Sequence, residues 1–382
     1  MKYRTFGRLA WRPSALGFGA MRLPTLGGDS AQIDEPEATR MIRYAIDHGV
    51  NYFDTAYGYH QGNSERVLGR ALQDGYRARV KLATKMPAWL VKSADDFDRF
   101  LDEQLAKLQT PFIDFYLIHG LRAERWQTVR DLGVRAWAER KIAEGKIGGL
   151  GFSFHDSFEV FSQILNEYDG WAMCQIQYNY MDVEHQAGVR GLQLAAERGL
   201  AVVVMEPLRG GLLAGPPPAS VQALWDAAAI RRTPADWALQ WVWDQPEVSV
   251  ALSGMSTMQQ VVENLASAER SAAEPLSADE LALVGRVRDQ YRMLTPIPCT
   301  DCKYCQPCPH KVAIPRIFDL YNMAMIYNAP DRARRAYQQW VREDERANCC
   351  LECGECESKC PQGIQIIEWL GKVDRYLTME TA

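Results

Sequence analysis

The sequence predicts an α/β protein in which a (β/α)8 TIM barrel, opened by a short hairpin, is followed by a small, mostly α-helical domain. Short apolar runs, each typical of a buried strand, alternate with amphipathic helical segments from residue 15 to residue 254. There are eight of these runs, the number that closes a barrel of alternating strands and helices. Nine of the ten cysteines lie beyond residue 298, so the C-terminal part has a chemistry of its own.

The barrel elements follow one another in order along the chain. The opening YRTFGRLAWRP alternates apolar and polar residues, which predicts a short hairpin that closes the barrel floor. Strands are predicted at residues 15–19, 51–56, 80–85, 112–119, 147–153, 173–179, 201–207 and 248–254. Helical patterns such as EPEATRMIRYAIDHG and SERVLGRALQD lie between them. We place the barrel domain at residues 1–290 and the second domain at residues 291–382.

Composition narrows the class of protein. The 382 residues are 47% hydrophobic and 24% charged, which is typical of a globular protein with room for one large and one small domain. The formal net charge of −5 gives no electrostatic reason to bind nucleic acid or anionic membranes. No signal peptide and no membrane span are predicted. We therefore expect a cytoplasmic protein, in which cysteines serve as metal ligands rather than in disulfides.

Four polar residues stand where predicted strands end. Asp54 ends the second strand, and Tyr59 follows in the next loop. Lys85 ends the third strand and His119 ends the fourth. Chemistry in such barrels takes place at the C-terminal ends of the strands, so we expect these four side chains to meet at the barrel mouth.

The segments FDTAYGYHQGNSE, LATK and FYLIHG resemble the aldo-keto reductase family. The resemblance runs from about residue 3 to residue 268 and includes LGFGAMRLP at the first strand, GGLGFS at the fifth, EPLRGGLL after the seventh and SGMSTMQQVVENL after the eighth. It implies an oxidoreductase that acts on a carbonyl/alcohol pair. It also implies that the catalytic tetrad consists of Asp54, Tyr59, Lys85 and His119.

The resemblance gives each member of the tetrad a role. Tyr59 would be the general acid that protonates the alkoxide left by hydride addition, and would accept the proton in the reverse reaction. The positive charge of Lys85 would lower the pKa of the phenol, and Asp54 would hold Lys85 in place and protonated. His119 would donate a hydrogen bond to the substrate oxygen.

The resemblance also implies a nicotinamide cofactor, NAD(P)(H), at the barrel mouth. Its contacts would come from Ser153, Gln175, Met205, Pro207, Leu208, Arg209, Gly211, Ser253, Gly254, Met255, Ser256, Gln260, Glu263 and Asn264. The pattern departs from the family at Phe154, where an asparagine is usual, and at Met205, where a ring-stacking tyrosine is usual. No lysine or arginine follows Gly254 to hold a 2′-phosphate, although Arg209 would compensate in part. The choice between NADP and NAD is therefore open, as is a flavin in the barrel mouth, and no G-x-G-x-x-G segment indicates a Rossmann site.

Two cysteine runs occupy the C-terminal part. CTDCKYCQPCPHK and CCLECGECESKCPQGI both repeat the three-residue step of bacterial ferredoxins, in which three thiolates bind one cubane and the fourth completes the neighbouring cluster. This predicts two [4Fe–4S] clusters with crossed ligands, one held by Cys299, Cys302, Cys305 and Cys360 and the other by Cys350, Cys353, Cys356 and Cys308. Cys308 follows a gap one residue shorter than the usual one, so its role relative to Cys349 is open. Cys174, in an apolar strand, is expected to be a buried and inert thiol.

A zinc interpretation uses the same eight cysteines, because C-x2-C pairs also build structural zinc sites. Three consecutive steps that end in Cys-Pro favour iron–sulfur clusters. Between the runs, apolar residues recur at helical intervals on either side of a break at Asn328 and Pro330, which predicts a pair of helices. This arrangement resembles the α-helical ferredoxin type that carries two tetranuclear clusters.

Three functional hypotheses join the two parts of the chain. In the first, the clusters of an aldo-keto reductase-type enzyme exchange electrons with a redox partner such as ferredoxin. In the second, an ordinary NAD(P)H-dependent carbonyl reductase has structural or oxygen-sensing clusters. In the third, which the complete tetrad disfavours, a non-enzymatic electron-transfer subunit has a vestigial barrel. We expect a small carbonyl or alcohol substrate, cyclic or apolar, in a pocket lined by Trp89, Trp126, Phe154 and Tyr178.

Overall fold

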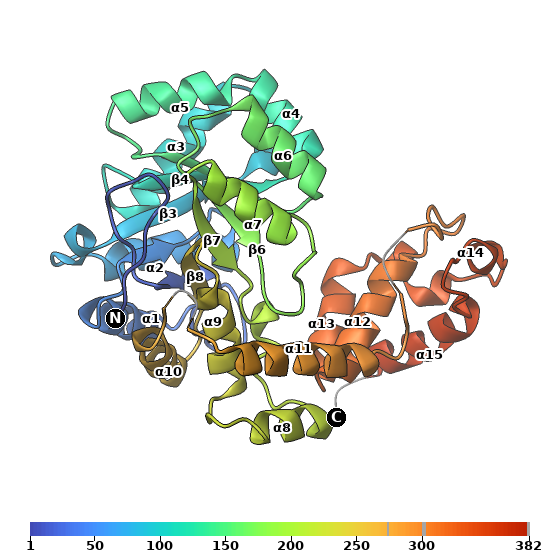
Figure 1. Ribbon diagram of the computed structural model, residues 1–382. Helices are drawn as coiled ribbons and strands as arrows, with labels where there is room; N and C mark the ends of the chain where they lie inside the picture. Colours follow the sequence, from blue (N-terminus) through green and yellow to red (C-terminus); the bar gives the residue numbers. More distant parts are fainter. Residues whose placement is uncertain (273–274, 300–302, 380–382) are drawn as a thin grey trace. The chain divides into compact units, whose positions relative to one another are not determined.

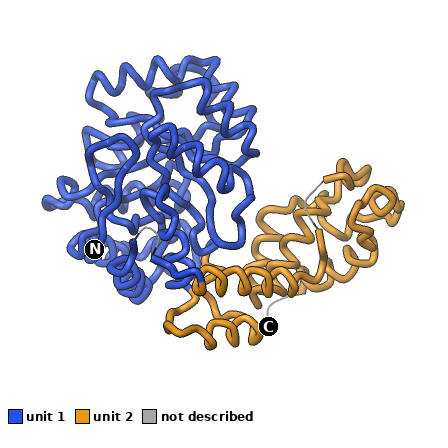
Figure 2. The backbone as a smooth tube through the Cα atoms, in the orientation of Figure 1, with its two compact units in different colours: residues 1–210, 235–278 blue, residues 211–234, 279–382 orange. Residues whose placement is uncertain are grey.

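The computed structural model describes residues 1–272, 275–299 and 303–379 (Figure 1). The chain divides into two compact units, each treated by itself below (Figure 2). The first comprises residues 1–210 and 235–278, and the second comprises residues 211–234 and 279–382. Segment 211–234 thus groups with the C-terminal unit, although it lies in sequence between two barrel strands. Cys302 lies outside the described residues.

Eight parallel strands form the closed barrel that the sequence predicts. Each strand pairs with the next, and the last pairs with the first. The strands are β1 (Leu16–Gly19), β2 (Tyr52–Asp54), β3 (Lys81–Met86), β4 (Phe115–Leu121), β5 (Leu150–Phe154), β6 (Met173–Gln177), β7 (Ala201–Met205) and β8 (Val248–Gly254). Each of the eight predicted runs therefore overlaps a strand, and the predicted fold class is confirmed.

Helices of the first unit follow the strands. They are α1 (Glu35–Asp47), α2 (Ser64–Ala71), α3 (Asp95–Leu108), α4 (Ala123–Asp131), α5 (Val134–Ala143), α6 (Phe158–Glu167), α7 (Gly188–Glu197), α9 (Pro234–Asp244) and α10 (Met258–Glu269). α1 shows why they form, since the Asp34 side chain caps its N-terminus by accepting the Glu37 N–H at 3.3 Å. Its buried face carries Met41 and Ile42, which join the barrel core.

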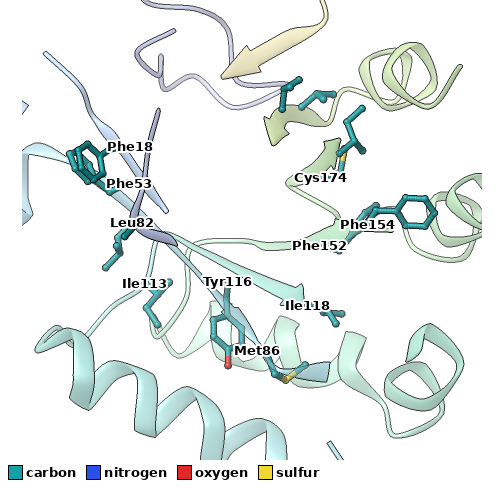
Figure 3. Packing of buried hydrophobic residues seen from close by; sticks show 14 of the residues in the cluster. Phe18, Phe53, Leu82, Met86, Ile113, Tyr116, Ile118, Phe152, Phe154 and Cys174 are labelled. Carbon is teal, nitrogen blue, oxygen red and sulfur yellow. The ribbon is translucent and has the colours of Figure 1, made fainter. Parts of the chain in front are cut away.

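Side chains alternate between the two faces of the barrel wall. Outward-facing residues such as Phe18, Phe53 and Phe152 join the large core that includes the surrounding helices (Figure 3). Inward-facing residues fill the lower barrel: Tyr52, Ala83, Phe115, Leu117, Met173, Ala201, Val203 and Val250. Gly151 makes room for them, because a Cβ there would lie 2.7 Å from Met173 Cγ. Polar side chains at the next inward positions therefore lie nearer the mouth.

The N-terminal segment closes the floor of the barrel. Antiparallel bridges join Tyr3 to Ser14 and Phe6 to Leu9, so the predicted hairpin is present as single bridges rather than as strands. The Phe6 ring is fully buried among the inward-facing residues, and its centroid lies 4.8 Å from that of Phe115. Hydrophobic burial of this one ring anchors the segment.

The second unit is helical. Its elements are α8 (Ala219–Asp226), α11 (Ala278–Met293), α12 (Ile314–Ile326), α13 (Pro330–Trp340), α14 (Glu355–Ser358) and α15 (Ile366–Thr378). α12 and α13 are the predicted helical pair, and they pack with α15 around a core that contains Phe318, Tyr337 and Val373. The buried Asn322 side chain both accepts from Ile297 N (3.1 Å) and donates to Ile297 O (2.8 Å), which holds the chain just before the first cysteine run. Among all the described residues, no helix is long and apolar enough to cross a membrane.

Candidate active site

A buried ion pair lies at the barrel mouth. Asp54 ends β2 and Lys85 lies on the neighbouring strand β3, both at inward positions. Lys85 Nζ lies 2.5 Å from Asp54 Oδ1 and donates to the carbonyl oxygen of Thr55 at 2.8 Å. The two side chains are only 2% and 1% exposed. The ammonium group is thus held in a fixed position and shielded from solvent.

The second oxygen of Asp54 is also bound. Gln175 Nε2, on β6, donates to Asp54 Oδ2 at 2.5 Å and also lies 3.3 Å from the hydroxyl of Tyr52. This amide was predicted to contact the cofactor, and in the structure it contacts Asp54. Asp54 therefore accepts hydrogen bonds on both oxygens, as a buried carboxylate requires.

Tyr59 is the third member of the group. Its hydroxyl lies 3.4 Å from Lys85 Nζ, and the ammonium nitrogen lies 4.9 Å from the ring centroid. The ring stands on a 3-10 turn, Tyr59–Gly62, in which His60 and Gln61 have left-handed backbone angles (φ 51° and 54°). The turn leaves the phenol half-buried beside the ammonium group.

His60 fastens this turn to the loop that follows β1. Its Nε2 accepts the Leu23 N–H at 3.1 Å, and its Nδ1 lies 2.7 Å from the Ser30 carbonyl oxygen. A backbone N–H can only donate, so Nε2 carries no proton and Nδ1–H donates to Ser30. Burial lowers the pKa of His60, which agrees with this neutral tautomer.

His119, on β4, completes the four predicted residues. Its ring centroid lies 5.8 Å from that of Tyr59, with the ring planes at 83°, and 5.1 Å from the ring of Trp89. Its Nδ1 atom is buried and has no hydrogen-bond partner within residues 1–272, 275–299 and 303–379. Burial and, after it, the charges of Lys85, His155 and Arg125 hold the pKa of His119 well below its ordinary value. The imidazole is therefore neutral at neutral pH.

Among the pKa shifts of Asp54, Lys85 and Tyr59, the shift of Tyr59 differs in direction from expectation. Burial would lower the pKa of Lys85, but Asp54 and Tyr59 outweigh burial and raise it, so the ammonium form is favoured. Burial raises the pKa of Asp54 against the opposing effect of Lys85. For Tyr59, burial likewise outweighs the attraction of Lys85 for the phenolate, so its pKa is raised rather than lowered. The phenol is thus a proton carrier that stays protonated at neutral pH.

Several predicted cofactor contacts are bound within the protein. Ser153 Oγ accepts the Gly120 N–H at 2.7 Å, and Asn264 Nδ2 donates to Ser253 Oγ at 3.1 Å. Met205 is at an inward position at the end of β7. Gly211 belongs to the second unit. The remaining predicted contacts lie at the end of β8, in the loops after β7 and β8, and in α10: Pro207, Leu208, Arg209, Gly254, Met255, Ser256, Gln260 and Glu263. These residues follow the same ends of the strands as the four predicted catalytic residues.

Two arginines lie near these loops, Arg209, which was predicted to contact the cofactor, and Arg22, which was not. Arg209 Nε lies 3.2 Å from Asp182 Oδ2, so its charge is partly neutralised. Arg22, which sequence reasoning missed, lies against the loop after β8, where Ser256 Oγ donates to its carbonyl oxygen at 2.7 Å. A Cβ at Gly254 would lie within 3.3 Å of the Arg22 side chain. The sequence signal was the arginine directly after β1, because β1 pairs with β8 when the barrel closes.

The expected pocket lining is only partly found. Trp89, which is 46% exposed, lies beside His119. Phe154 faces outward and packs on Phe161 of α6, with centroids 5.1 Å apart. Trp126 is buried in the same core, and its Nε1 donates to Glu167, while Tyr178 packs on Trp241. The expectation that Trp126, Phe154 and Tyr178 line the mouth is therefore wrong. Phe154 and Tyr178 are in the core between barrel wall and helices, because outward positions on the wall face the helices, and Trp126 lies on α4 in the same core.

In the second unit, the cysteines line two neighbouring cavities. One cavity is lined by Cys305, Cys308, Cys350, Cys353 and Cys356 among others, and the second is lined by Cys299, Cys305 and Cys360 among others. This grouping supports the crossed assignment, since Cys308 and Cys360 each lie with the opposite run. Within the described residues, no three His, Cys, Asp or Glu side chains are arranged to hold a single metal ion. Thiols spaced around a cavity fit a cluster better than a lone zinc ion.

The two other cysteines lie apart from these cavities. Cys349 Sγ lies 3.3 Å from the carbonyl oxygen of Glu343 and does not line either cavity. Cys174 is fully buried on β6, and burial raises the pKa of its thiol. A raised pKa leaves the thiol protonated and unreactive.

Comparison with known proteins separates the barrel from the part of the chain that carries the two cysteine runs. Residues 15–288 match the aldo/keto reductase family, and residues 298–365 match a 4Fe-4S dicluster domain. L-galactose dehydrogenase of Arabidopsis thaliana is 27% identical over 77% of this chain and 97% of its own length. The NADH-specific methylglyoxal reductase of Escherichia coli (strain K12) is 27% identical over 69% of this chain and 90% of its own.

Solved structures show the same barrel. The holo form of aldo-keto reductase AKR11C1 from Bacillus halodurans superposes with a TM-score of 0.62 and 27% identity, covering 75% of this chain and 96% of its own. An aldo-keto reductase from Klebsiella pneumoniae in complex with NADPH gives a TM-score of 0.60 with 27% identity, covering 75% of this chain and 96% of its own.

Proposed function

The chain belongs to the aldo/keto reductase family, is an oxidoreductase of that type with a C-terminal 4Fe-4S domain, and we propose that Tyr59 is its proton donor in carbonyl reduction. The observation that carries the proposal is the chain of contacts Tyr59–Lys85–Asp54, with distances of 3.4 Å and 2.5 Å. An ammonium group fixed beside a phenol stabilises the phenolate that remains once the proton has left.

Each residue then has one task. A nicotinamide cofactor held at the barrel mouth would supply the hydride for reduction or accept it in the reverse reaction. Tyr59 Oη gives its proton to the carbonyl oxygen of the substrate, and Lys85 stabilises the resulting phenolate. Neutral His119 retains a ring N–H that donates to the same substrate oxygen and orients it. Asp54 keeps Lys85 protonated and in place.

The test compares two tyrosines that are neighbours in sequence. Tyr59→Phe removes the proton donor, whereas Tyr57→Phe removes a hydroxyl that donates to Glu103 at 2.9 Å. In anaerobic assays of NADPH or NADH oxidation with a panel of aldehydes, Tyr59→Phe is expected to lose about 100-fold or more of kcat. Tyr57→Phe is expected to stay within about threefold of the parent, since this hydroxyl bonds Glu103 and takes no part in the Tyr59–Lys85–Asp54 chain of contacts. Equal rates for the two variants would refute the assignment.

For the cofactor, we propose NAD(P)(H) bound by the loops after β7 and β8. Arg22 supports binding of a phosphate there, because its side chain packs against the Gly254 loop and its guanidinium group has, among the described residues, only a distant carboxylate, Glu206, at 3.9 Å. Arg209 contributes less, since Asp182 lies closer to its guanidinium group, at 3.2 Å. Arg22→Gln is expected to raise the KM for NADPH more than that for NADH if the guanidinium binds the 2′-phosphate. An equal rise in both values would place Arg22 at the pyrophosphate.

For the second unit, we propose two [4Fe–4S] clusters with crossed ligands, in which Cys302 completes the set of Cys299, Cys305 and Cys360. The two cysteine-lined cavities support this assignment. Iron analysis of anaerobically purified protein is expected to give about eight iron atoms per chain. Cys308→Ser is expected to lower this number to about four, while Cys349→Ser, the matched control, leaves it unchanged. A normal iron content in Cys308→Ser would show that another ligand completes that cluster.

We further propose that the clusters exchange electrons with a redox partner such as a ferredoxin. The bound cofactor carries two electrons as a hydride, whereas each cluster carries one, and two clusters match that count. The competing hypothesis gives the clusters a structural or oxygen-sensing role. Mixing the protein with NADPH under argon distinguishes them, because coupling bleaches the visible absorbance of the clusters. Unchanged absorbance together with full carbonyl turnover favours the structural role.

A further inference from the structure

A cationic group lies beside His119 and has no part in the tetrad. Trp89 covers the His119 ring at 5.1 Å, and the guanidinium carbon of Arg125 lies 5.5 Å from the Trp89 centroid. Arg125 Nη1 also donates to the carbonyl oxygen of Gly120, the residue after His119, at 2.7 Å. The guanidinium is therefore anchored within one residue of His119. A single bond of this kind leaves most of its five N–H groups available.

Further positive or protonatable groups surround Arg125. Arg122 precedes α4, and His155 follows β5 with its Nδ1 atom 3.2 Å from Gln186 Oε1. The pKa of His155 is lowered by burial and, beyond that, by the charges of Arg122 and Arg125. Burial, Lys85 and, among other charges, Arg125 lower the pKa of His119. Burial is the main cause of both shifts, and the nearby arginines add to it.

Three acidic groups of the mouth lie beside other cations. Asp54 is paired with Lys85, and Asp182 is paired with Arg209. Glu206 lies 3.9 Å from Arg22. These three carboxylates therefore already have cationic partners.

Neither Glu124 nor Asp156 forms an ion pair with Arg125 within the described residues. Asp156 accepts the backbone N–H groups of Ala123 and Ser157, and Glu124 is exposed. Within the described ranges, neither Arg122 nor Arg125 forms an ion pair with a carboxylate at 4.0 Å or less. A half-buried guanidinium without a carboxylate is typical of a site that receives its anion from a ligand.

We propose that the substrate of the reaction assigned above is a carboxylate-bearing carbonyl or alcohol, and that Arg125 binds the carboxylate while His119 and Tyr59 bind the reacting oxygen. The inference rests on the proposed function for its reaction, but not for its binding site. The planar fork of Arg125 matches a carboxylate, and the Trp89 ring offers an apolar face to the carbon skeleton between the two ends. Arg122 adds charge at the entrance.

The kinetic test compares two aldehydes of equal shape, 4-carboxybenzaldehyde and 4-methylbenzaldehyde. The parent protein is expected to prefer the carboxylate by about tenfold or more in kcat/KM. Arg125→Gln is expected to lower kcat/KM for the carboxylate by about 10- to 100-fold and for the methyl compound by less than about threefold. Arg140→Gln, the same charge change on an exposed position of α5, is the matched control and should alter neither. A parallel loss for both aldehydes, or no preference in the parent, overturns the proposal.

A binding test separates this inference from the proposed function. Calorimetric titration with benzoate and with benzamide requires no turnover. Benzoate is expected to bind and benzamide to bind at least about tenfold more weakly, with the difference lost in Arg125→Gln. If no aldehyde is reduced but this difference is present, the reaction assignment fails and the carboxylate site stands. Equal binding of the two probes overturns the site.

Discussion

Removing Lys85 tests the buried ion pair at the centre of the site. At 2.5 Å, the attraction between Lys85 and Asp54 amounts to about 7 kcal/mol at an effective dielectric constant of about 20. Desolvation of the two charges offsets most of this attraction. Lys85→Met, however, leaves Asp54 buried without its cation, and breaking such a pair costs about 3–5 kcal/mol.

This free energy is large for a barrel of this size. It corresponds to a fall in melting temperature of roughly 10 °C, because each kcal/mol shifts the Tm of a domain of about 250 residues by about 2–4 °C. Thermal unfolding followed by near-UV circular dichroism under argon measures the shift on the full-length protein with its clusters. Arg79→Met is the matched control: it breaks an exposed pair with Asp47 whose side chains are 47% and 48% exposed, and should cost less than about 1 kcal/mol.

A double variant separates structure from chemistry. Asp54→Asn combined with Lys85→Met removes both charges and is expected to restore most of the lost Tm but none of the carbonyl reduction. Two results would refute the reasoning. One is a Lys85→Met protein that melts within about 2 °C of the parent, which would mean that the carboxylate is solvated or already neutral. The other is recovery of activity in the double variant.

Three further predictions concern pH and metal. Burial raises the pKa of Tyr59, so the rate of carbonyl reduction by the parent should be constant through neutral pH and fall only above about pH 10. The rate of alcohol oxidation should rise with pH. A reduction rate that already halves between pH 7 and 8 would contradict a protonated phenol. The lowered pKa of His60 means that the folded chain binds this proton less readily than the unfolded chain, so its contribution to stability is complete above about pH 6.5 and declines as the pH falls below that value. The acid-induced fall in Tm should therefore be shallower in His60→Asn, and identical slopes would rule out a role for this ring. Removing iron with a chelator should lower the Tm of the helical unit, because the cysteine-lined cavities lie against its core, and a Tm independent of iron would indicate that the thiols do not bind it.

Much of the fold could be predicted because its determinants are local. The two-residue alternation of the strands places Asp54, Lys85 and His119 on inward positions at the mouth, and the helix patterns between the runs leave few other ways to close a sheet. The same alternation, counted one residue further along β5, would have shown that Phe154 faces outward when Ser153 faces inward. The outward position of Phe154 could therefore have been predicted from the sequence.

Other features depended on contacts between distant residues. The amide of Gln175 binds Asp54, 121 residues away in sequence, and Arg22 meets the loop after β8 only because the barrel closes between β1 and β8. The contacts of Arg125 with Trp89 and of Trp89 with His119 join residues from two successive βα units. No short stretch of sequence specifies these contacts.

The sequence by itself determined the barrel, the helical unit with its two cysteine runs, and the residue types of the tetrad, because hydrophobic period and residue spacing act within a few residues. Only the tertiary structure decided the electrical state of the site: whether burial or the ammonium group dominates the pKa of Tyr59, which carboxylates already have cations, and which arginine is left for a substrate. The reason is that desolvation and Coulomb energies depend on distance and exposure in space, which the order of residues along the chain does not contain.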